Sequence, residues 1–422
     1  MEAFAYREEN GARVLHAEGV PLPAVAARFG TPTYCYANAL LVDRYRALAE
    51  AAPGALICYA VKANDAVAVI RTFARLGAGA DIISGGEMHG ALRAGVAPER
   101  LVFAGPGKTR DEMDQALAAG IGQFNVESPA ELDALDAAAR AQGTRAPVAL
   151  RVNPDVDAGT HEKIATGRRG DKFGIDDAEI PALYAHAAAL EGIEPLGLAV
   201  HIGSQLSRLA PFEAAYERLI ALAEGLRAAG HPVTRVNLGG GLGVRYRDET
   251  PPDVAAYGLL VERVRQRLGV TVVIEPGRWL VAPAGVLLTR VIAVKQAGER
   301  RWAIVDAAMN DLLRPALYDA WHAIDPVVEP APGGATVETD IAGPVCESGD
   351  VLGRGRRLPP LAAGDLLAVR DVGAYGAVMA STYNGRPLPA EVMVRGDALA
   401  PVRPRQDHEA LLARDLVPPW LS

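Results

Sequence analysis

The stretch ALICYAVKAN, residues 55–64, contains an apolar run of strand length that ends at Lys62. Seven similar runs come later in the chain, separated by polar or glycine-rich turns and by longer stretches in which apolar residues recur every three or four positions. The eight runs are residues 55–61, 78–83, 101–104, 122–126, 147–152, 196–202, 234–238 and 270–274. Eight strand-and-helix units over roughly 250 residues match a (β/α)8 barrel, whereas six would favour a doubly wound sheet. We therefore predict an α/β protein in which residues 31–283 form a TIM barrel.

The pattern changes beyond the predicted barrel, where strands follow one another with few helical segments between them. The strands expected there are residues 286–296, 301–306, 335–341, 365–371 and 391–395. We predict a mostly β second domain of residues 284–422, joined by residues 1–30, which precede the barrel pattern.

Composition excludes several classes of protein. The formal net charge of −8 comes from interspersed charges, so no basic stripe indicates a nucleic-acid partner. The chain has no uninterrupted apolar run of about 18 residues and no apolar stretch of signal-peptide length at its start, which predicts a cytoplasmic protein without a membrane partner. Cys35, Cys58 and Cys346 are too widely spaced to indicate a disulfide framework or a metal site.

Polar residues follow directly after several of the runs, where a barrel places its active site. Lys62 ends the first run, and His201 and Ser204 follow the sixth. The seventh and eighth runs precede two further groups, which are Gly239, Gly240 and Gly241, and Glu275, Gly277 and Arg278. Alone, a lysine at a strand end is most often a solvated charge and a glycine run is most often a turn. Because all these groups fall on one face of the barrel, they predict a single site.

The glycine run indicates the kind of cofactor. Its spacing differs from the dinucleotide fingerprint, so a nicotinamide cofactor is disfavoured. After the seventh strand it matches the usual phosphate site of barrels, where bare amides approach an anion closely, and the Ser204 hydroxyl adds a further donor. A phosphate anchor and Lys62 at one barrel mouth together predict pyridoxal 5′-phosphate, which is held both covalently and by its phosphate.

These residues resemble the fold III pyridoxal-phosphate enzymes, the group of alanine racemase and the barrel-type basic amino-acid decarboxylases, and within it the diaminopimelate decarboxylase family. The similar motifs include DIISGGE at residues 81–87, MNDLLRPALY at 309–318 and GPVCESGD at 343–350. The others are residues 59–64, 151–154, 157–161, 172–174, 201–205, 239–243, 275–278 and 373–376.

The resemblance implies an alanine racemase-like fold and a homodimer whose active sites are completed across the interface. It implies a Schiff base between Lys62 and the cofactor, with His201 stacked on the cofactor ring. Glu275 would keep the pyridine nitrogen protonated, which makes the ring a strong electron sink. The cofactor phosphate would be bound by Ser204, Gly239, Gly240, Gly241, Gly277, Arg278 and Tyr375.

The resemblance also implies the substrate and the proton donor. The reaction would convert meso-2,6-diaminopimelate to L-lysine and CO2, the last step of lysine biosynthesis. Cys346 from the neighbouring subunit would return a proton, since a thiol with a reference pKa of about 8.5 is largely protonated at neutral pH. The residues that would bind the substrate are Arg278, Arg314, Tyr318, Glu347 and Tyr375.

Three alternatives remain open. A decarboxylase of ornithine, arginine or carboxynorspermidine would leave Arg314 and Tyr318 without a distal carboxylate to bind. Alanine racemase needs a weak sink at the pyridine nitrogen, usually an arginine, where Glu275 stands here. A noncatalytic pyridoxal-phosphate carrier is a barrel alone, whereas this chain has a long second domain, and inactive paralogues tend to lose the lysine or the thiol.

Overall fold

The computed structural model describes residues 3–156, 172–331 and 333–421. The chain forms two compact units. The barrel unit is Val42–Leu280, and the β unit combines Met1–Leu41 with Val281–Ser422. In the described part of the chain, no helix combines the length and the apolar character needed to cross a membrane.

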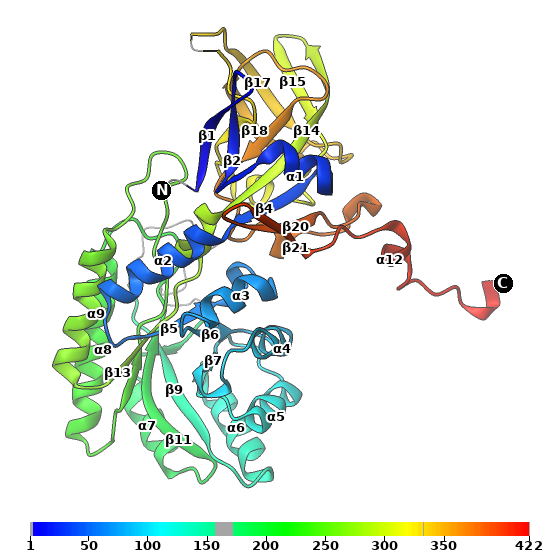
Figure 1. Ribbon diagram of the computed structural model, residues 1–422. Coiled ribbons are helices and arrows are strands. Elements are labelled where there is room, and N and C mark those ends of the chain that lie inside the picture. The colour runs from blue at the N-terminus through cyan, green and yellow to red at the C-terminus, as the bar shows by residue number, and fades with distance from the viewer. Residues whose placement is uncertain (1–2, 157–171, 332, 422) are drawn as a thin grey trace. The chain divides into compact units, whose positions relative to one another are not determined.

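Eight parallel strands close on themselves in the barrel unit, because β13 pairs with β5 and β8 pairs with β9 (Figure 1). They are β5 (Leu56–Ala60), β6 (Gly79–Ile82), β7 (Leu101–Phe103), β8 (Gln123–Val126), β9 (Ala146–Asn153), β11 (Ile193–Val200), β12 (Arg235–Asn237) and β13 (Thr271–Ile274). A two-residue strand, β10 (Ile175–Asp176), pairs with β9. Each strand lies within or across one of the eight predicted runs, so the (β/α)8 barrel prediction is confirmed.

Helices cover the outside of the barrel, one before its first strand β5 and the others after the strands β5 to β12 (Figure 1). They are α2 (Asn38–Ala51), α3 (Val67–Ala74), α4 (Gly85–Ala94), α5 (Arg110–Ala119), α6 (Pro129–Ala141), α7 (Ile180–Ala189), α8 (Ala210–Ala228) and α9 (Val254–Leu268). The side chains of Ser84, Thr109, Ser128 and Asp253 each accept a backbone amide at the start of a helix. Such caps satisfy amides that have no partner within the helix, which is why these helices begin where they do.

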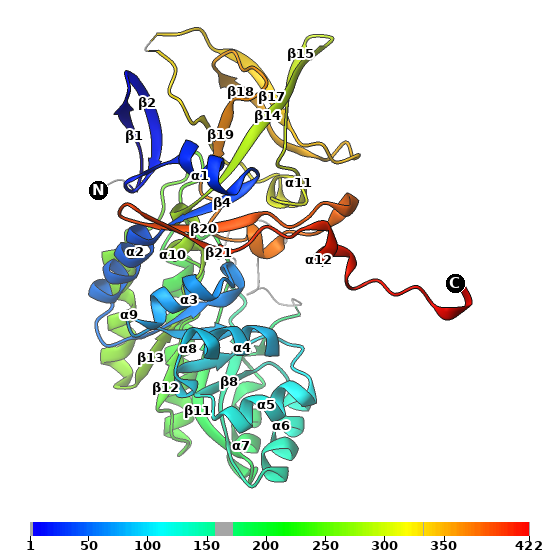
Figure 2. The ribbon, with the colours of Figure 1, turned by 45° about the vertical axis from the view of Figure 1, so that its right-hand side comes forward.

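The β unit contains a hairpin sheet and a larger mixed sheet (Figure 2). The small sheet has β1 (Phe4–Glu9), β2 (Ala12–Ala17) and β3 (Val20–Pro21), which lead into α1 (Leu22–Phe29). The large sheet has the order β18 (Val351–Leu358), β17 (Val337–Ala342), β15 (Arg300–Val305), β14 (Gly285–Ala297), β4 (Thr33–Ala37), β20 (Ala390–Arg395) and β21 (Ala398–Arg403). β19 (Leu366–Val369) pairs with β14 and with β16 (Ile324–Pro326). The short helices of this unit are α11 (Arg314–Tyr318) and α12 (His408–Leu412), and α10 (Arg278–Val281) spans the boundary with the barrel unit.

The unit boundary differs from the predicted one because of β4. This strand is antiparallel to β14 and parallel to β20, so residues 31–41 belong to the β unit, whereas the sequence placed the barrel start at residue 31. All five residues of β4 are buried. A fully buried strand has the same apolar pattern in a barrel as in the centre of a mixed sheet, so the sequence did not reveal its partners.

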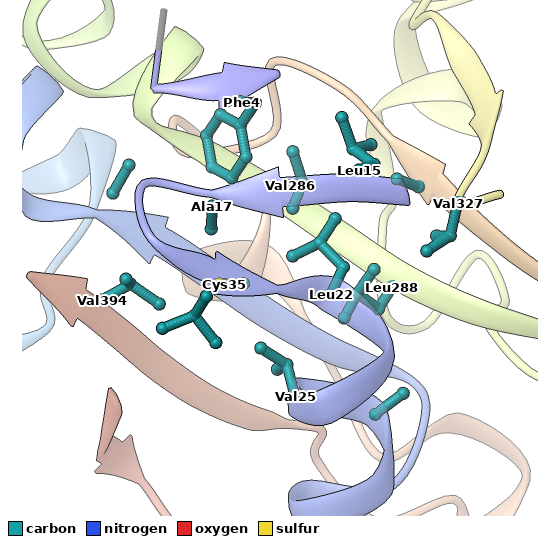
Figure 3. Packing of buried hydrophobic residues seen from close by; sticks show 14 of the residues in the cluster. Phe4, Leu15, Ala17, Leu22, Val25, Cys35, Val286, Leu288, Val327 and Val394 are labelled. Carbon is teal, nitrogen blue, oxygen red and sulfur yellow. The ribbon is translucent and has the colours of Figure 1, made fainter. Parts of the chain in front are cut away.

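One apolar core holds the N-terminal segment against the large sheet of the β unit (Figure 3). Phe4, Leu15 and Leu22 come from the start of the chain, and they pack with Val286 and Leu288 of β14. Burying an aliphatic side chain contributes about 1.5–3 kcal/mol. This packing explains why the first 41 residues fold with the end of the chain.

Candidate active site

Lys62 lies in a single helical turn, η1 (Val61–Ala63), that directly follows β5. Its Nζ is 2.5 Å from Oδ2 of Asp81, a fully buried residue of β6. The other oxygen of Asp81, Oδ1, is buried and has no hydrogen-bond partner among the described residues. The barrel therefore holds an amine beside a buried carboxylate at the carboxyl ends of two neighbouring strands.

Glu275 follows β13 and is buried in the same region of the barrel. Its Oε1 accepts hydrogen bonds from Nδ2 of Asn237 at 2.5 Å and from Nδ2 of Asn125 at 3.3 Å. Burial, followed by the nearby charge of Asp81, raises the pKa of Glu275 to about 7, against a lowering contribution from Lys62. No described residue donates a hydrogen bond to Oε2, so this carboxyl can accept one from a bound molecule.

His201 follows β11, and its proton position can be inferred from one contact. The amide of Gly240 donates to Nδ1 of His201 at 3.1 Å, so Nδ1 is an acceptor and the ring proton is on Nε2. Burial, together with the charges of Arg151 and Lys62, holds the pKa of His201 well below its usual range. His201 is therefore a neutral ring at neutral pH, suited to packing against another flat ring.

The glycine turn after β12 has no room for side chains. A Cβ would lie 2.2 Å from the Val200 carbonyl oxygen at Gly239, 2.0 Å from the Glu275 carbonyl oxygen at Gly240, and 2.6 Å from the Gly203 carbonyl oxygen at Gly241. Gly239 and Gly241 also have φ values of +68° and +117°, which favour glycine. Any other residue would push this turn away from the strands that support it.

The amides of this turn have different partners. The Gly239 amide donates to Oδ1 of Asn237 and the Gly240 amide to His201. The amides of Gly241 and Gly277 have no acceptor among residues 3–156, 172–331 and 333–421. These two remain available for an anion such as a phosphate.

A cation and two hydroxyls lie beside these amides. Arg278 donates from Nη2 and Nε to Oγ of Ser204 at 3.2 and 3.3 Å, and from Nη1 to the hydroxyl of Tyr246 at 2.9 Å. The Arg278 side chain is buried, so its charge is poorly screened by water. The donors that converge here fit a phosphate group, and together with Lys62, His201 and Glu275 they fit an aromatic aldehyde with a phosphate arm.

In the β unit, Cys346 and Glu347 lie in the exposed loop between β17 and β18. Asp350 fixes this loop, since it accepts the amide of Val345 at 2.8 Å through Oδ2 and the amide of Met309 at 2.6 Å through Oδ1. The Cys346 amide donates to Oδ1 of Asn384 at 3.0 Å. The thiol is therefore exposed on a loop that is fixed by hydrogen bonds of Asp350 and Asn384 to backbone amides.

Arg314 and Tyr318 lie one turn apart on α11 of the same unit. Nη1 of Arg314 is 2.7 Å from Nε2 of His322, whose Nδ1 is 2.8 Å from the carbonyl oxygen of Arg370. A guanidinium only donates and a carbonyl only accepts, so His322 carries its proton on Nδ1 and accepts from Arg314. Tyr375 lies in the turn between β19 and a short helical turn, η5 (Ala377–Met379), with φ of +55°.

The predicted residues thus fall into two groups, one in each unit. Lys62, His201, Ser204, Gly239, Gly240, Gly241, Glu275, Gly277 and Arg278 gather in the barrel unit, and Arg314, Tyr318, Cys346, Glu347 and Tyr375 are in the β unit. The motif at residues 157–161 lies outside the described residues. Sequence reasoning assigned no role to Asp81, Asn125, Asn237, Tyr246 or Asp350. Asp81 and Asp350 lie within the family motifs at residues 81–87 and 343–350, whereas Asn125 has no distinguishing signal in the sequence.

Comparison with known proteins identifies the family of the chain. Residues 38–282 match the family model described as "Pyridoxal-dependent decarboxylase, pyridoxal binding domain". Diaminopimelate decarboxylase of Pseudomonas aeruginosa is 50% identical, with 99% of this chain and 100% of the relative covered, and that of Zymomonas mobilis is 48% identical, with 98% and 99% covered. The crystal structure of the Helicobacter pylori diaminopimelate decarboxylase complexed with L-lysine has a TM-score of 0.89 at 38% identity, covering 93% of this chain and 98% of that one. The chain therefore belongs to the diaminopimelate decarboxylase family of pyridoxal-phosphate-dependent enzymes.

Proposed function

We propose that the protein decarboxylates meso-2,6-diaminopimelate to L-lysine and CO2, the last step of lysine biosynthesis, with pyridoxal 5′-phosphate covalently attached to Nζ of Lys62. The observation that carries the proposal is the position of the Lys62 amine at the barrel mouth, in the same unit as the buried carboxyl of Glu275 and the neutral ring of His201. A phosphate-type site at Ser204 and Arg278 supports the same cofactor.

Bound pyridoxal phosphate supplies an electron sink for the pair left on the α-carbon when the carboxylate departs as CO2. Glu275 accepts a hydrogen bond from the ring nitrogen, for which its Oε2 is available. His201 packs on the ring face as a neutral imidazole. Lys62 provides the amine that attaches the cofactor, and Asp81 holds this amine in place through its buried Oδ2.

The phosphate contacts divide into two kinds. Gly241 and Gly277 offer amides, Ser204 and Arg278 offer a hydroxyl and a charge, and Tyr375 offers a hydroxyl from the β unit. Gly239 and Gly240 were expected to bind the phosphate, but their amides already donate to Asn237 and His201. We propose that these two glycines shape the turn, while Gly241 binds the anion.

Cys346 of the partner subunit returns the proton that replaces the departed carboxylate. The bond from the α-carbon to the carboxylate breaks, CO2 leaves, and Sγ donates its proton to that carbon, so that the substrate loses CO2 and gains one proton. Within its own chain Cys346 is exposed, as expected for a group that acts on a neighbour. We propose a cytoplasmic homodimer in which each site uses residues of both subunits.

The substrate contacts explain the preference for a diacid. Arg278, Arg314, Tyr318 and Tyr375 offer cations and hydroxyls for the distal carboxylate, and Glu347 offers an anion for the distal ammonium. Arg314 is buried, so its charge is poorly screened by water and would attract the distal carboxylate of the substrate. Sites of this kind reject deficient analogues by about 10⁴-fold or more.

The test is incubation of the purified protein with meso-diaminopimelate or with ornithine in separate reactions. Lysine and CO2 are expected from the first substrate and no diamine from the second. Consumption of ornithine without formation of lysine would refute the substrate assignment. Borohydride reduction followed by peptide mapping tests the attachment independently, and an adduct at any lysine other than Lys62 would refute it.

A further inference from the structure

A line of polar side chains crosses the interior of the barrel from the half-buried Arg235, through the buried Gln123 and Asn125, to Glu275. Nη1 of Arg235 is 3.5 Å from Oε1 of Gln123, and Nε2 of Gln123 donates to Oδ1 of Asn125 at 2.6 Å. Nδ2 of Asn125 then donates to Oε1 of Glu275 at 3.3 Å. Gln123 and Asn125 belong to β8 and Arg235 to β12, and these strands are separated in the barrel by β9 and β11. The contacts therefore cross the interior and do not follow the sheet.

The line runs from the amino end of the barrel to its mouth. Gln123 and Arg235 are the first residues of β8 and β12, and Asn125 and Asn237 lie two residues further along the same strands. Positions two apart on a strand share a face, so these residues occupy successive layers of the interior. Barrel interiors are mostly filled with branched apolar side chains, and a buried polar group is costly unless it is hydrogen-bonded. Two polar layers beneath Glu275 therefore need a functional explanation.

The direction of every hydrogen bond in the line is set at its far end. A guanidinium has no acceptor, so Arg235 turns the carbonyl oxygen of Gln123 toward itself. Arg235 is anchored in turn, because Nη1 also donates to the carbonyl oxygen of Gly122 at 3.0 Å. Gln123 must then point its NH2 group at Asn125, and Asn125 must point its own NH2 group at Glu275. The orientation of the Asn125 amide is thus fixed by a charge two side chains away.

We propose that Gln123, held by Arg235, is a positioning residue that keeps the Asn125 amide a donor to Glu275, so that Glu275 stays an acceptor toward the cofactor ring nitrogen. The inference rests on the proposed function for the identity of the cofactor. Asn237, the second donor to Glu275, has a separate lock, since its Oδ1 accepts the Gly239 amide at 2.9 Å. Both amides beneath Glu275 are therefore held in the donating orientation, each by a different part of the barrel.

Some of the charged groups that face Glu275 raise its pKa and others lower it. Asp81 raises the pKa of Glu275, whereas Lys62 and Arg151 lower it, and the Asn237 hydrogen bond lowers it further. Cys58 and Tyr257 are also close enough to interact with Glu275 electrostatically. Because burial raises the pKa to about 7, a change in one donor should alter the charge of Glu275 near neutral pH.

Two substitutions at Gln123 separate positioning from core filling. Gln123→Met keeps the length of the side chain and removes both hydrogen bonds. Gln123→Glu pairs with Arg235 but can only accept from Asn125, so the Asn125 amide must turn its oxygen toward Glu275. If Gln123 positions Asn125, the dissociation constant of pyridoxal phosphate should rise about 10- to 100-fold in Gln123→Glu, the effect of one hydrogen bond to a charged group. Gln123→Met should show a smaller rise, although its unfolding temperature should be no higher than that of Gln123→Glu.

Comparison of the unfolding temperatures with the cofactor affinities gives the outcome that would contradict the proposal. If Gln123 were only a filler, cofactor affinity would fall in the same order as unfolding temperature in the two variants. The proposal would be overturned if the two orders agreed, or if Gln123→Glu bound pyridoxal phosphate as tightly as the wild type.

A second readout does not depend on the cofactor. Titration of the Glu275 carboxyl by 13C NMR in the cofactor-free protein, assigned with Glu275→Gln, should give a higher pKa in Gln123→Glu than in the wild type. Gln123→Met, which adds no charge, should shift the pKa in the same direction by less. Identical titrations in all three proteins would overturn the positioning role. If the wild type failed to bind pyridoxal phosphate, the proposed function would fall, and this titration would still decide whether Gln123 acts on Glu275.

Discussion

Nζ of Lys62 lies 2.5 Å from Oδ2 of Asp81, and Oδ1 of the same carboxylate is buried with no hydrogen-bond partner in the part of the chain that the structure describes. Asp81 also acts on Glu275, because its charge is the second cause, after burial, of the raised pKa of that carboxyl. The same carboxylate thus holds the Lys62 amine, proposed to attach the cofactor, and influences Glu275, proposed to face the cofactor ring.

Asp81→Asn should therefore change the titration of Glu275. Removal of the negative charge lowers the pKa of Glu275 from about 7, so the acid limb of the pH profile of kcat should move to lower pH. Attachment of the cofactor should also be slower, because Lys62 loses its anionic partner. The measurements are the pH dependence of kcat and the rate of the absorbance change when pyridoxal phosphate is added.

The matched control is Asp114→Asn, which removes an exposed carboxylate that pairs with Arg110 on α5. Exposed pairs contribute little, so neither the pH profile nor the attachment rate should change. A Glu275 titration that stayed in place in Asp81→Asn would contradict the assigned coupling.

Glu275→Gln should change stability in opposite directions with and without cofactor. The folded pKa of Glu275, about 7, lies above its ordinary value of 4.5, so its contribution to stability is present below pH 4.5 and is lost as the pH rises through 7. As the pH rises from 5 to 8, the free energy of unfolding of the cofactor-free variant should therefore increase relative to that of the wild type by roughly 1–3 kcal/mol.

Urea unfolding of the cofactor-free proteins at several pH values measures this difference. With pyridoxal phosphate bound, the variant should instead be less stable than the wild type, since the ring nitrogen loses its anionic partner. A stability difference that did not vary with pH would mean that Glu275 is not protonated in this range.

Two glycine-to-alanine substitutions, one in the glycine turn and one on α8, differ in what the new Cβ would meet. Gly240→Ala would place a Cβ 2.0 Å from the Glu275 carbonyl oxygen, and such overpacking costs about 1–3 kcal/mol. It should also weaken binding of pyridoxal phosphate, because His201 and Glu275 are both in contact with this residue. Gly225→Ala on the exposed face of α8 meets no atom within 4 Å and should stabilise the protein by about 0.5–1 kcal/mol. Thermal unfolding and cofactor titration measure both effects, and equal behaviour of the two variants would contradict the role of the turn.

The sequence predicted the barrel because each buried parallel strand has a local apolar signature and each strand end has a polar one. It did not predict that β4 leaves the barrel, because the partners of a buried strand are not encoded in its own pattern. Lys62, His201 and Glu275 could be selected as candidates because strand ends share one face of a barrel, and their roles stay predictions. Gln123 and Asn125 were missed, because their contacts cross the interior between strands far apart in sequence and the fold gives no reason to expect polar residues there.

The three cysteines should react very differently with iodoacetamide. Cys35 and Cys58 are fully buried, and burial raises the pKa of the Cys35 thiol to about 12 and that of Cys58 well above its usual range. Cys346 is exposed. Intact mass should show a single modification of the native protein and three in denaturant, and activity should fall in parallel with the single modification. Cys346→Ser should take up no label under native conditions, and labelling of that variant would show that a second thiol is accessible.

If each active site is shared between two subunits, mixing two inactive variants should restore part of the activity. Lys62→Ala removes the proposed cofactor attachment in the barrel unit, and Cys346→Ala removes the proposed proton donor in the β unit, so each variant should be nearly inactive alone. If a barrel works with the Cys346 loop of its partner, a mixed dimer contains one site in which both residues are intact. Random exchange of subunits should then restore about a quarter of wild-type activity per subunit, as expected for a two-fold symmetric dimer. A mixture of Lys62→Ala with the double variant Lys62→Ala/Cys346→Ala is the control and should stay inactive. No recovery after verified subunit exchange would mean that Lys62 and Cys346 act within one chain, because a site built from a single subunit gains nothing from mixing.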